Sequence, residues 1–344
     1  MSKLNVVSAA IMAASMFSFC SVGFSQGYTH DNIEAQARQS WRNTVMHASP
    51  PNKTGCFHIS YPQTEWAQVG CTAAPNRPFA KWPKSSSNFL GAAAFAKFQA
   101  QTVGDGTDYV AEVPGLLTYS VGDFPTVSGV TSETGSLGAN DYSLQLNSNF
   151  MSTAACNGHS GCLAWQQFIY SSGEQAVFMQ YWLIDYGTCP SGWNTDGDSC
   201  YKNSAAVSVP KIAISELNQL SIWANAIPGG VDQVGLGTGD DYITSGVDFY
   251  AIREPDSVVD LSSDWKESEF NIFGDGGGSA ATFNQGSSIT VFNQLGEQGS
   301  VYYAPTCVQN AGTTGETNNL TLGSCSTLAG SPSSNPSMTF TESN

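Results

Sequence analysis

The chain has 344 residues and a formal net charge of −16 at pH 7, and only 12% of its residues are charged. A typical globular protein has roughly 25% charged residues, so this surface must be built largely from hydroxyl and amide side chains, as in many secreted β-rich proteins. The strong negative charge argues against nucleic acid or an anionic membrane as a partner. The length suits one large domain with a smaller segment, or two domains.

Residues 1–25 have the pattern of a secretory signal peptide. A lysine near the N-terminus precedes a long apolar run, and the small residues Gly23 and Ser25 permit cleavage before Gln26. A membrane anchor is the alternative, since the run is nearly long enough to span a bilayer. The abundance of alanine and serine in the run favours a signal peptide, and therefore a secreted protein with no membrane attachment after cleavage.

Eight cysteines remain once the signal peptide, which contains Cys20, is removed. An even number of cysteines in an exported chain predicts disulfide bonds. The chain has only four histidines and no zinc-type cysteine spacing, so we expect no metal site and no cofactor. Proximity in the sequence favours one pairing and leaves other connectivities open: Cys56 with Cys71, Cys156 with Cys162, Cys189 with Cys200 and Cys307 with Cys325.

The charge is distributed unevenly along the chain. Residues 26–100 contain seven basic and three acidic side chains, whereas residues 101–344 contain four basic and 25 acidic ones. The basic segment includes an amphipathic pattern that predicts a helix from Asn32 to His47. Two interpretations of residues 26–100 stay open. They are a structural N-terminal subdomain, or a basic pro-segment that lies on the acidic domain at neutral pH and loses this attraction in acid.

From about residue 108 onward, short runs of β-forming residues alternate with turns rich in Gly, Asn, Asp and Ser. This pattern predicts an all-β fold, a concanavalin-like antiparallel β-sandwich preceded by a short segment that contains a helix. We expect residues 101–298 to form the main domain and residues 299–344 a disulfide-stapled β extension. The expected strands are Tyr109–Val113, Leu116–Val121, Tyr142–Phe150, Trp165–Tyr170, Ala176–Tyr186, Ala205–Val209, Ser221–Ala226, Asp241–Ile252, Glu269–Phe273, Ser288–Phe292 and Met338–Thr341.

Two of the expected strands carry amide side chains on one face. In Tyr142–Phe150, alternation places Gln145 on one face with other amides and serines, and the apolar residues on the other face. In Ala176–Tyr186, Gln180 and Trp182 share a face with further aromatic residues. Aromatic and amide side chains together are typical of a cleft that binds a long neutral ligand such as a peptide or a glycan.

Several familiar catalytic motifs are absent from the sequence. The single G-x-S-x-G pattern spans the expected signal cleavage site, and the aspartic-protease triplets and the H-E-x-x-H motif do not occur. Carboxylate and amide side chains therefore remain as candidates. A partly desolvated carboxylate can act as a general base on water and then as a general acid. An amide NH₂ group can stabilise the oxyanion of a tetrahedral intermediate.

Four stretches carry a resemblance to a known family: Ser143–Phe150, Ala164–Tyr170, the pair Val207–Val209 and Leu220–Trp223, and Ser268–Val291 with its glycine-rich turn. They resemble strands of the eqolisins, which are glutamic endopeptidases with a two-sheet β-sandwich, over roughly residues 108–292. The related neprosin-like peptidases use two glutamates, and Gln145 fits the eqolisin pattern better. The tryptophan-containing stretch that eqolisins place before the glutamine is replaced here by VTSETGSLGAND, and the residues from Gly299 onward have no counterpart.

The resemblance implies a catalytic dyad of Gln145 and Glu269, with residues 101–298 as the catalytic domain. Glu269 would deprotonate a water molecule and later protonate the leaving nitrogen, while Gln145 would stabilise the oxyanion. Residues of the neighbouring strands would bind the substrate, and they are Trp165, Gln167, Tyr170, Gln180 and Trp182. The expected function is that of a secreted, monomeric endopeptidase that hydrolyses polypeptides at acidic pH.

A secreted carbohydrate-binding or glycan-cleaving β-sandwich is the alternative function, and a structural exoprotein is a third. Two carboxylates about 5–9.5 Å apart across a cleft would favour a glycosidase. Gln145 and Glu269 around one water-sized space would favour the peptidase.

Overall fold

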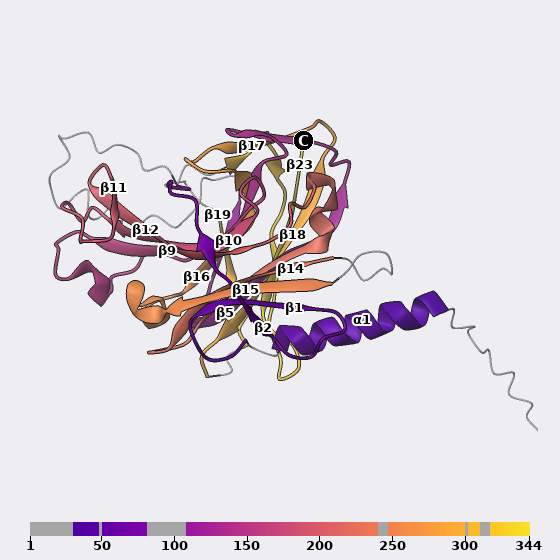
Figure 1. Cartoon of the computed structure of the whole chain (residues 1–344). Helices are drawn as coiled ribbons and strands as arrows, with labels where there is room; N and C mark the ends of the chain where they lie inside the picture. The colour runs from indigo at the N-terminus through magenta and orange to yellow at the C-terminus, as the bar shows by residue number, and fades with distance from the viewer. Residues whose placement is uncertain (1–29, 48–49, 81–107, 240–246, 300–301, 310–316) are drawn as a thin grey trace, which may run out of the picture.

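The computed structural model describes residues 30–47, 50–80, 108–239, 247–299, 302–309 and 317–344. Two large antiparallel sheets pack face to face in this part of the chain (Figure 1). The prediction of an antiparallel β-sandwich with a short N-terminal helix is therefore confirmed. The expected signal peptide, residues 1–25, lies outside the described residues.

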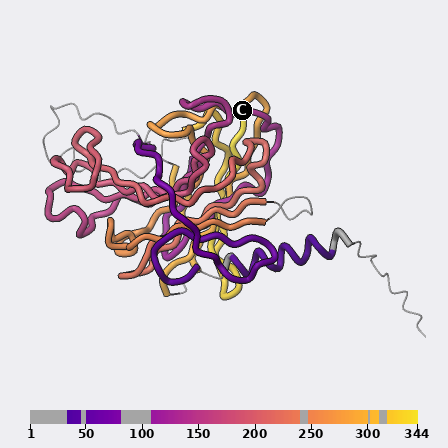
Figure 2. Tube along the Cα trace, viewed as in Figure 1, coloured from indigo at the N-terminus to yellow at the C-terminus, as the bar shows by residue number. Residues whose placement is uncertain are grey.

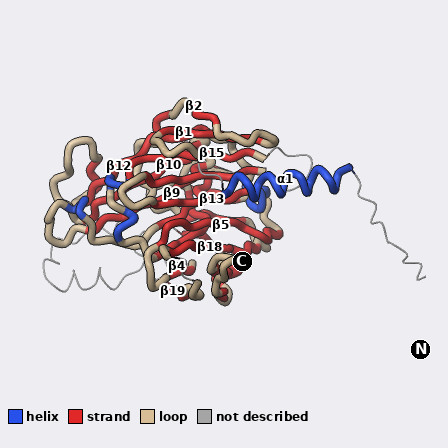
Figure 3. Tube along the Cα trace, turned by 90° about the horizontal axis from the view of Figure 1, so that it is seen from below, coloured by secondary structure: helices blue, strands red, loops and turns tan. Residues whose placement is uncertain are grey.

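The first sheet has ten strands. In spatial order they are β2 (Ala67–Val69), β1 (Gly55–Ser60), β15 (Asp248–Pro255), β14 (Val231–Thr238), β13 (Leu220–Ala226), β5 (Leu117–Ser128), β18 (Ser288–Glu297), β23 (Ser337–Ser343) and β21 (Thr321–Leu322), with β22 (Ser326–Leu328) also beside β23. Figure 3 labels β2, β1, β15, β13, β5 and β18 of this sheet, and they follow one another in this order. Many neighbouring strands are far apart in the sequence, so the sheet depends on long-range pairing.

The second sheet has nine strands and carries the candidate residues. In spatial order they are β11 (Asn194–Asp196), β12 (Ser199–Ser208), β10 (Ala176–Ile184), β9 (Leu163–Ser171), β8 (Tyr142–Asn147), β16 (Glu267–Gly274), β4 (Tyr109–Glu112) and β19 (Thr306–Gln309), with β3 (Thr72–Ala73) also beside β12. A small third sheet contains β20 (Thr317–Asn318), β17 (Ala280–Phe283), β6 (Glu133–Gly135) and β7 (Gly138–Ala139). Short 3₁₀ helices lie at Ala154–Cys156, Ile214–Gln219, Asp256–Val258 and Leu261–Ser263.

The core lies between the two large sheets, because each strand turns alternate side chains inward. Phe124 of β5 and Phe270 of β16 meet across it, with ring centroids 5.0 Å apart. Gly122, also on β5, lies against the Phe270 ring, where a Cβ atom would stand 2.2 Å from a ring carbon. Glycine at this position therefore lets the sheets approach. Burial of such apolar surface stabilises the fold by roughly 25 cal/mol per Å².

The N-terminal segment contributes to the edges of both sheets. The predicted helix is present as α1 (His30–His47), and its Trp41 packs on Phe249 of β15 with ring centroids 5.6 Å apart. β1 pairs with β15 over all six of its residues, and β3 pairs with β12 of the second sheet. Figure 2 shows the indigo part of the trace crossing from the first sheet to the second. This segment is therefore part of the folded sandwich.

The C-terminal residues also complete both sheets. β23 pairs with β18 along seven residue pairs in the first sheet, and β19 pairs with β4 in the second. The extension expected at residues 299–344 thus supplies strands to the sandwich itself.

All four predicted disulfide bonds are present: Cys56–Cys71, Cys156–Cys162, Cys189–Cys200 and Cys307–Cys325. Disulfide bonds are typical of proteins from oxidising compartments, which agrees with the expected export. In the part of the chain that the structure describes, no helix is long and apolar enough to cross a membrane.

The sequence pattern does not predict β14. Its glycines disfavour a strand when the segment is considered alone. In the structure Gly235 of β14 faces the indole of Trp223 on β13, where a Cβ atom would lie 2.0 Å from the ring. Glycine makes room for this tryptophan, which is a tertiary contact that a local pattern cannot reveal. Of the predicted strand Asp241–Ile252, the residues before 247 lie outside the described residues.

Two buried carboxyl groups make the stability of the fold depend on pH. Burial raises the pKa of Glu342, on β23, from 4.5 to about 8, although hydrogen bonds from two asparagine side chains lower it. Burial, and then the charges of Asp141 and Asp275, raise the pKa of Glu133 from 4.5 to about 8. Between the ordinary pKa and the raised pKa, the folded state therefore binds protons that the unfolded chain releases.

We expect the free energy of unfolding to be largest near pH 4 and to fall as the pH rises toward 8, by up to about 1.4 kcal/mol per pH unit for each group. Thermal unfolding between pH 4 and pH 8 measures this as a falling Tm. In Glu342→Gln, which has no proton to lose, we expect a smaller slope. Glu112→Gln, which changes an exposed glutamate, is the control and should keep the slope of the wild type. A Tm that stays constant or rises toward pH 8 would contradict this pH dependence.

Candidate functional site

The second sheet has one apolar and one polar face. On β8, Leu144 and Leu146 belong to the core, so Gln145 and Asn147 point to the opposite side. We call this side, which is turned away from the first sheet, the polar face. Every residue of β8, β9 and β10 is buried. Polar groups on these strands must therefore find hydrogen-bond partners inside the protein.

Gln145 and Glu269 both lie on the polar face, on adjacent strands. β16 runs antiparallel to β8, with Glu269 opposite Asn147 and Asn271 opposite Gln145. The two candidates are therefore diagonal neighbours, a relation in which the Cα atoms are about 7–8 Å apart. Both side chains are fully buried. The pairing of β8 with β16 thus brings together two residues that are far apart in the sequence.

Glu269 belongs to a row of polar side chains that crosses five strands. From Glu269 on β16, the register continues through Asn147, Gln167, Gln180 and Asn203, on β8, β9, β10 and β12 respectively. Each amide side chain can both donate and accept hydrogen bonds. A row of this kind suits a ligand that presents alternating N–H and C=O groups, as a polypeptide backbone does.

Hydrogen bonds orient the two candidate catalytic side chains. Asn147 Nδ2 donates to Glu269 Oε2 at 2.7 Å. Gln167 Nε2 donates to Gln145 Oε1 at 2.7 Å, and Trp182 Nε1 in turn donates to Gln167 Oε1 at 2.9 Å. The oxygen of Gln145 is therefore engaged, and its NH₂ group, which donates to a serine hydroxyl at 2.8 Å, has a second N–H. An N–H donor is the group that an oxyanion requires.

Four of the five expected substrate-binding residues are on the polar face, and one is not. The register places Trp165 opposite Trp182 and Gln167 opposite Gln180. Tyr170 points to the other side of β9 and packs in the core, with its hydroxyl donating to the Pro210 carbonyl oxygen at 3.2 Å. Tyr170 therefore lies apart from the other four residues. Gln167 and Tyr170 are three residues apart on β9, and side chains an odd number of residues apart on a strand point to opposite faces.

Asn147 is a site residue that the sequence analysis did not single out. It lies opposite Glu269 and donates to its carboxylate. The signal was present in the sequence, since Asn147 shares a face with Gln145 on the expected strand. Its significance depends on the register between β8 and β16, which the sequence does not specify.

An acidic cluster lies beside the polar face, around the end of β16. Asp275 accepts a hydrogen bond from Ser171 of β9 at 3.0 Å. Burial raises the pKa of Asp275 from 3.8 to about 6, although the charge of Arg77 lowers it. Arg77 pairs with Asp275 at 3.4 Å and also with Glu174. The members of the cluster are Glu133, Asp141, Glu174 and Asp275.

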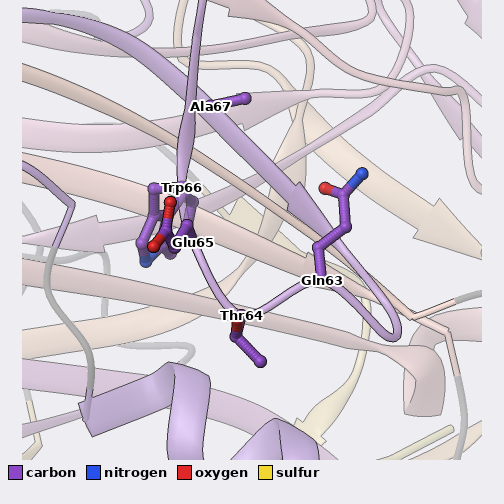
Figure 4. Close-up of a pocket in the computed structure, with 5 residues that line it drawn as sticks. All are labelled: Gln63, Thr64, Glu65, Trp66 and Ala67. Atoms are coloured by element: carbon purple, nitrogen blue, oxygen red, sulfur yellow. The ribbon is translucent and has the colours of Figure 1, made fainter.

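The described residues contain no group of three or more His, Cys, Asp or Glu side chains that would hold a metal ion. A shallow hollow lies at the turn between β1 and β2, and Figure 4 shows its lining residues. They are Gln63, Thr64, Glu65, Trp66 and Ala67. None of the candidate catalytic or substrate-binding residues lines this hollow.

No protein-family model, no curated protein and no solved structure matches this chain.

Proposed function

We propose that this protein is a secreted acid endopeptidase that hydrolyses peptide bonds with Glu269 and Gln145. The observation that carries the proposal is the diagonal position of these two buried side chains on one face of adjacent strands. The resemblance in sequence motifs points to the same two residues. The long-range pairing of β8 with β16 is an independent reason to group them.

In the proposed reaction Glu269 removes a proton from a water molecule, and the water oxygen attacks the carbonyl carbon of the scissile bond. The NH₂ group of Gln145 donates to the oxyanion that forms. Glu269 then gives its proton to the leaving nitrogen, which restores the carboxylate. Asn147, through its hydrogen bond to Glu269 Oε2, holds the carboxylate in one orientation. The leaving nitrogen receives the proton that Glu269 took from water, so Glu269 must begin the cycle as a carboxylate. The expectation of activity in acid comes from the resemblance to the eqolisins.

Residues 75–80 of the N-terminal segment lie on one end of the polar row, where part of the proposed substrate would bind. Residues 75–80 contact Gln180 and Asn203, which belong to the polar row. This position favours the pro-segment interpretation, whereas the pairing of β1 with β15 favours a structural role. Displacement of residues 75–80 alone is compatible with both interpretations. The Cys56–Cys71 bond and β1 precede these residues in the chain and would stay in place.

The class of substrate tests the proposal. We expect the secreted protein to release new amino termini from casein at acidic pH, and to release no reducing sugar from soluble polysaccharides under the same conditions. A polypeptide is expected because the amide row suits a peptide backbone. Release of reducing ends without peptide cleavage would instead establish the glycan-cleaving alternative.

A further inference from the structure

Residues 75–80 are bound to the polar face through their main chain. The Gln180 side chain donates from Nε2 to the Arg77 carbonyl at 3.0 Å and accepts at Oε1 from the Phe79 N–H at 2.8 Å. Asn203 Nδ2 donates to the Pro75 carbonyl oxygen. One amide side chain thus binds two polar groups of the bound backbone, the Arg77 carbonyl and the Phe79 N–H. Pro78, which lies between them, has no N–H that would need a partner.

A glycine-rich loop holds the same segment from the other side. The N–H groups of Gly277 and Gly278 donate to the carbonyl oxygens of Pro78 and Phe79 at 2.9 and 2.8 Å. Gly276, Gly277 and Gly278 all have positive φ, at 91°, 63° and 63°, which is the region that favours glycine. A Cβ atom on Gly276 would also lie 2.5 Å from Arg77 Nε. The loop conformation therefore permits close approach of a bound chain.

Two side chains of the segment occupy distinct environments. Phe79 is fully buried and packs against Phe178, with ring centroids 5.3 Å apart, in a cluster with Ile169. The Arg77 guanidinium pairs with Glu174 and Asp275 and lies 5.0 Å from the centre of the Phe79 ring. The Arg77 side chain thus lies in the acidic cluster, and the Phe79 ring lies in a buried apolar cluster.

Two cations of the described residues pair with carboxyl groups of the acidic cluster, and one of them belongs to residues 75–80. Lys211 pairs with Asp141, and Arg77 supplies the positive charge beside Asp275. Asp275 is fully buried, whereas Arg77 remains partly exposed. A buried carboxylate needs charged or hydrogen-bonding partners. Ser171 of β9 donates a hydrogen bond to Asp275, and Arg77 of the bound segment supplies the positive charge.

We propose that the polar face is a binding site for polypeptides with an arginine two residues before an aromatic residue, and that residues 75–80 are its resident ligand. The backbone contacts to Gln180 and to the glycine loop provide general affinity for a peptide. The acidic cluster and the Phe178 pocket provide the selectivity. Cleavage of such a peptide rests on the proposed function, whereas its binding does not.

Amide hydrogen exchange tests whether residues 75–80 are bound to the polar face. The full chain carries Glu269→Gln, so that it cannot process itself by the proposed mechanism. In this chain, we expect Arg77→Glu and Phe79→Ala each to raise the rate of amide exchange at position 79, Gly277 and Gly278 at least about tenfold. Arg38→Glu, in the same N-terminal segment but on α1, is the matched control and should leave these amides unchanged. Unchanged exchange in both variants, with all four disulfide bonds intact, would overturn the proposal.

A labelled peptide with the sequence of residues 74–80, APNRPFA, tests selectivity in trans. We expect it to bind the full chain carrying Arg77→Glu, Phe79→Ala and Glu269→Gln, and to bind poorly to the chain with Glu269→Gln alone. In the latter chain the tethered segment competes at a high effective concentration. Peptides with glutamate for the arginine or alanine for the phenylalanine should bind at least about tenfold more weakly. Equal binding of all three peptides, or of none, would refute the selectivity. If binding is selective but no polypeptide is ever cleaved, only the proposed function fails.

Discussion

Glutamine in place of Glu269 should reduce peptide-bond hydrolysis by at least about 10³-fold. In the proposed mechanism one carboxylate provides both the general base and the general acid, and each such role contributes about 10²–10⁴. The substitution is nearly isosteric. The new side chain keeps an oxygen that can accept from Asn147 Nδ2, which now donates to Glu269 Oε2 at 2.7 Å. We therefore expect the fold to be retained and kcat, rather than KM, to fall.

Initial rates on a quenched fluorescent peptide at acidic pH measure this effect, and thermal unfolding of the same sample verifies the fold. Glu112→Gln is the matched control, because Glu112 is an exposed glutamate on the neighbouring strand β4. Its activity should equal that of the wild type. Activity of Glu269→Gln within a few-fold of the wild type would remove Glu269 from the reaction.

Alanine in place of Gln145 should lower kcat by about 10²–10³-fold, which is the effect of removing one oxyanion donor. The substitution also leaves the buried Gln167 Nε2 without its acceptor, at a cost of about 1–3 kcal/mol in stability. The two effects can be separated. A purely structural role would lower the free energy of unfolding without a selective loss of kcat.

Steady-state kinetics and urea unfolding of the same preparations provide both quantities for Gln145→Ala. Gln294→Ala, on β18 of the first sheet, is the control for loss of a glutamine from a strand. We expect near-normal kinetics for the control. Unchanged kcat in Gln145→Ala would show that another group stabilises the oxyanion.

The architecture was predictable from the sequence because its signals are local. Alternation in Tyr142–Asn147 correctly separates Gln145 from the core leucines. The cysteine couples are close in the sequence, and their proximity was sufficient to pair them. The helix that ends at His47 carries its own apolar periodicity.

The features that escaped prediction depend on contacts between distant segments. Asn147 acquires its role from the register with β16, and Gly235 is explained by the indole of Trp223. Residue type groups Tyr170 with Trp165, although the alternation of side chains along β9 places Tyr170 in the core. The position of residues 75–80 on the polar face could not be foreseen, because their contacts are with Gln180 and a loop near residue 277.

We propose that Glu269 and Gln145 together hydrolyse peptide bonds in acid. The most direct test is the rate at which the wild type and Glu269→Gln cleave one quenched peptide from pH 2 to pH 8, with the intact mass of each protein measured in parallel. We expect the wild type to cleave the peptide in the acidic part of this range, and Glu269→Gln to cleave it at least about 10³-fold more slowly. Cleavage by both proteins at equal rates, or by neither at any pH, would contradict the proposal.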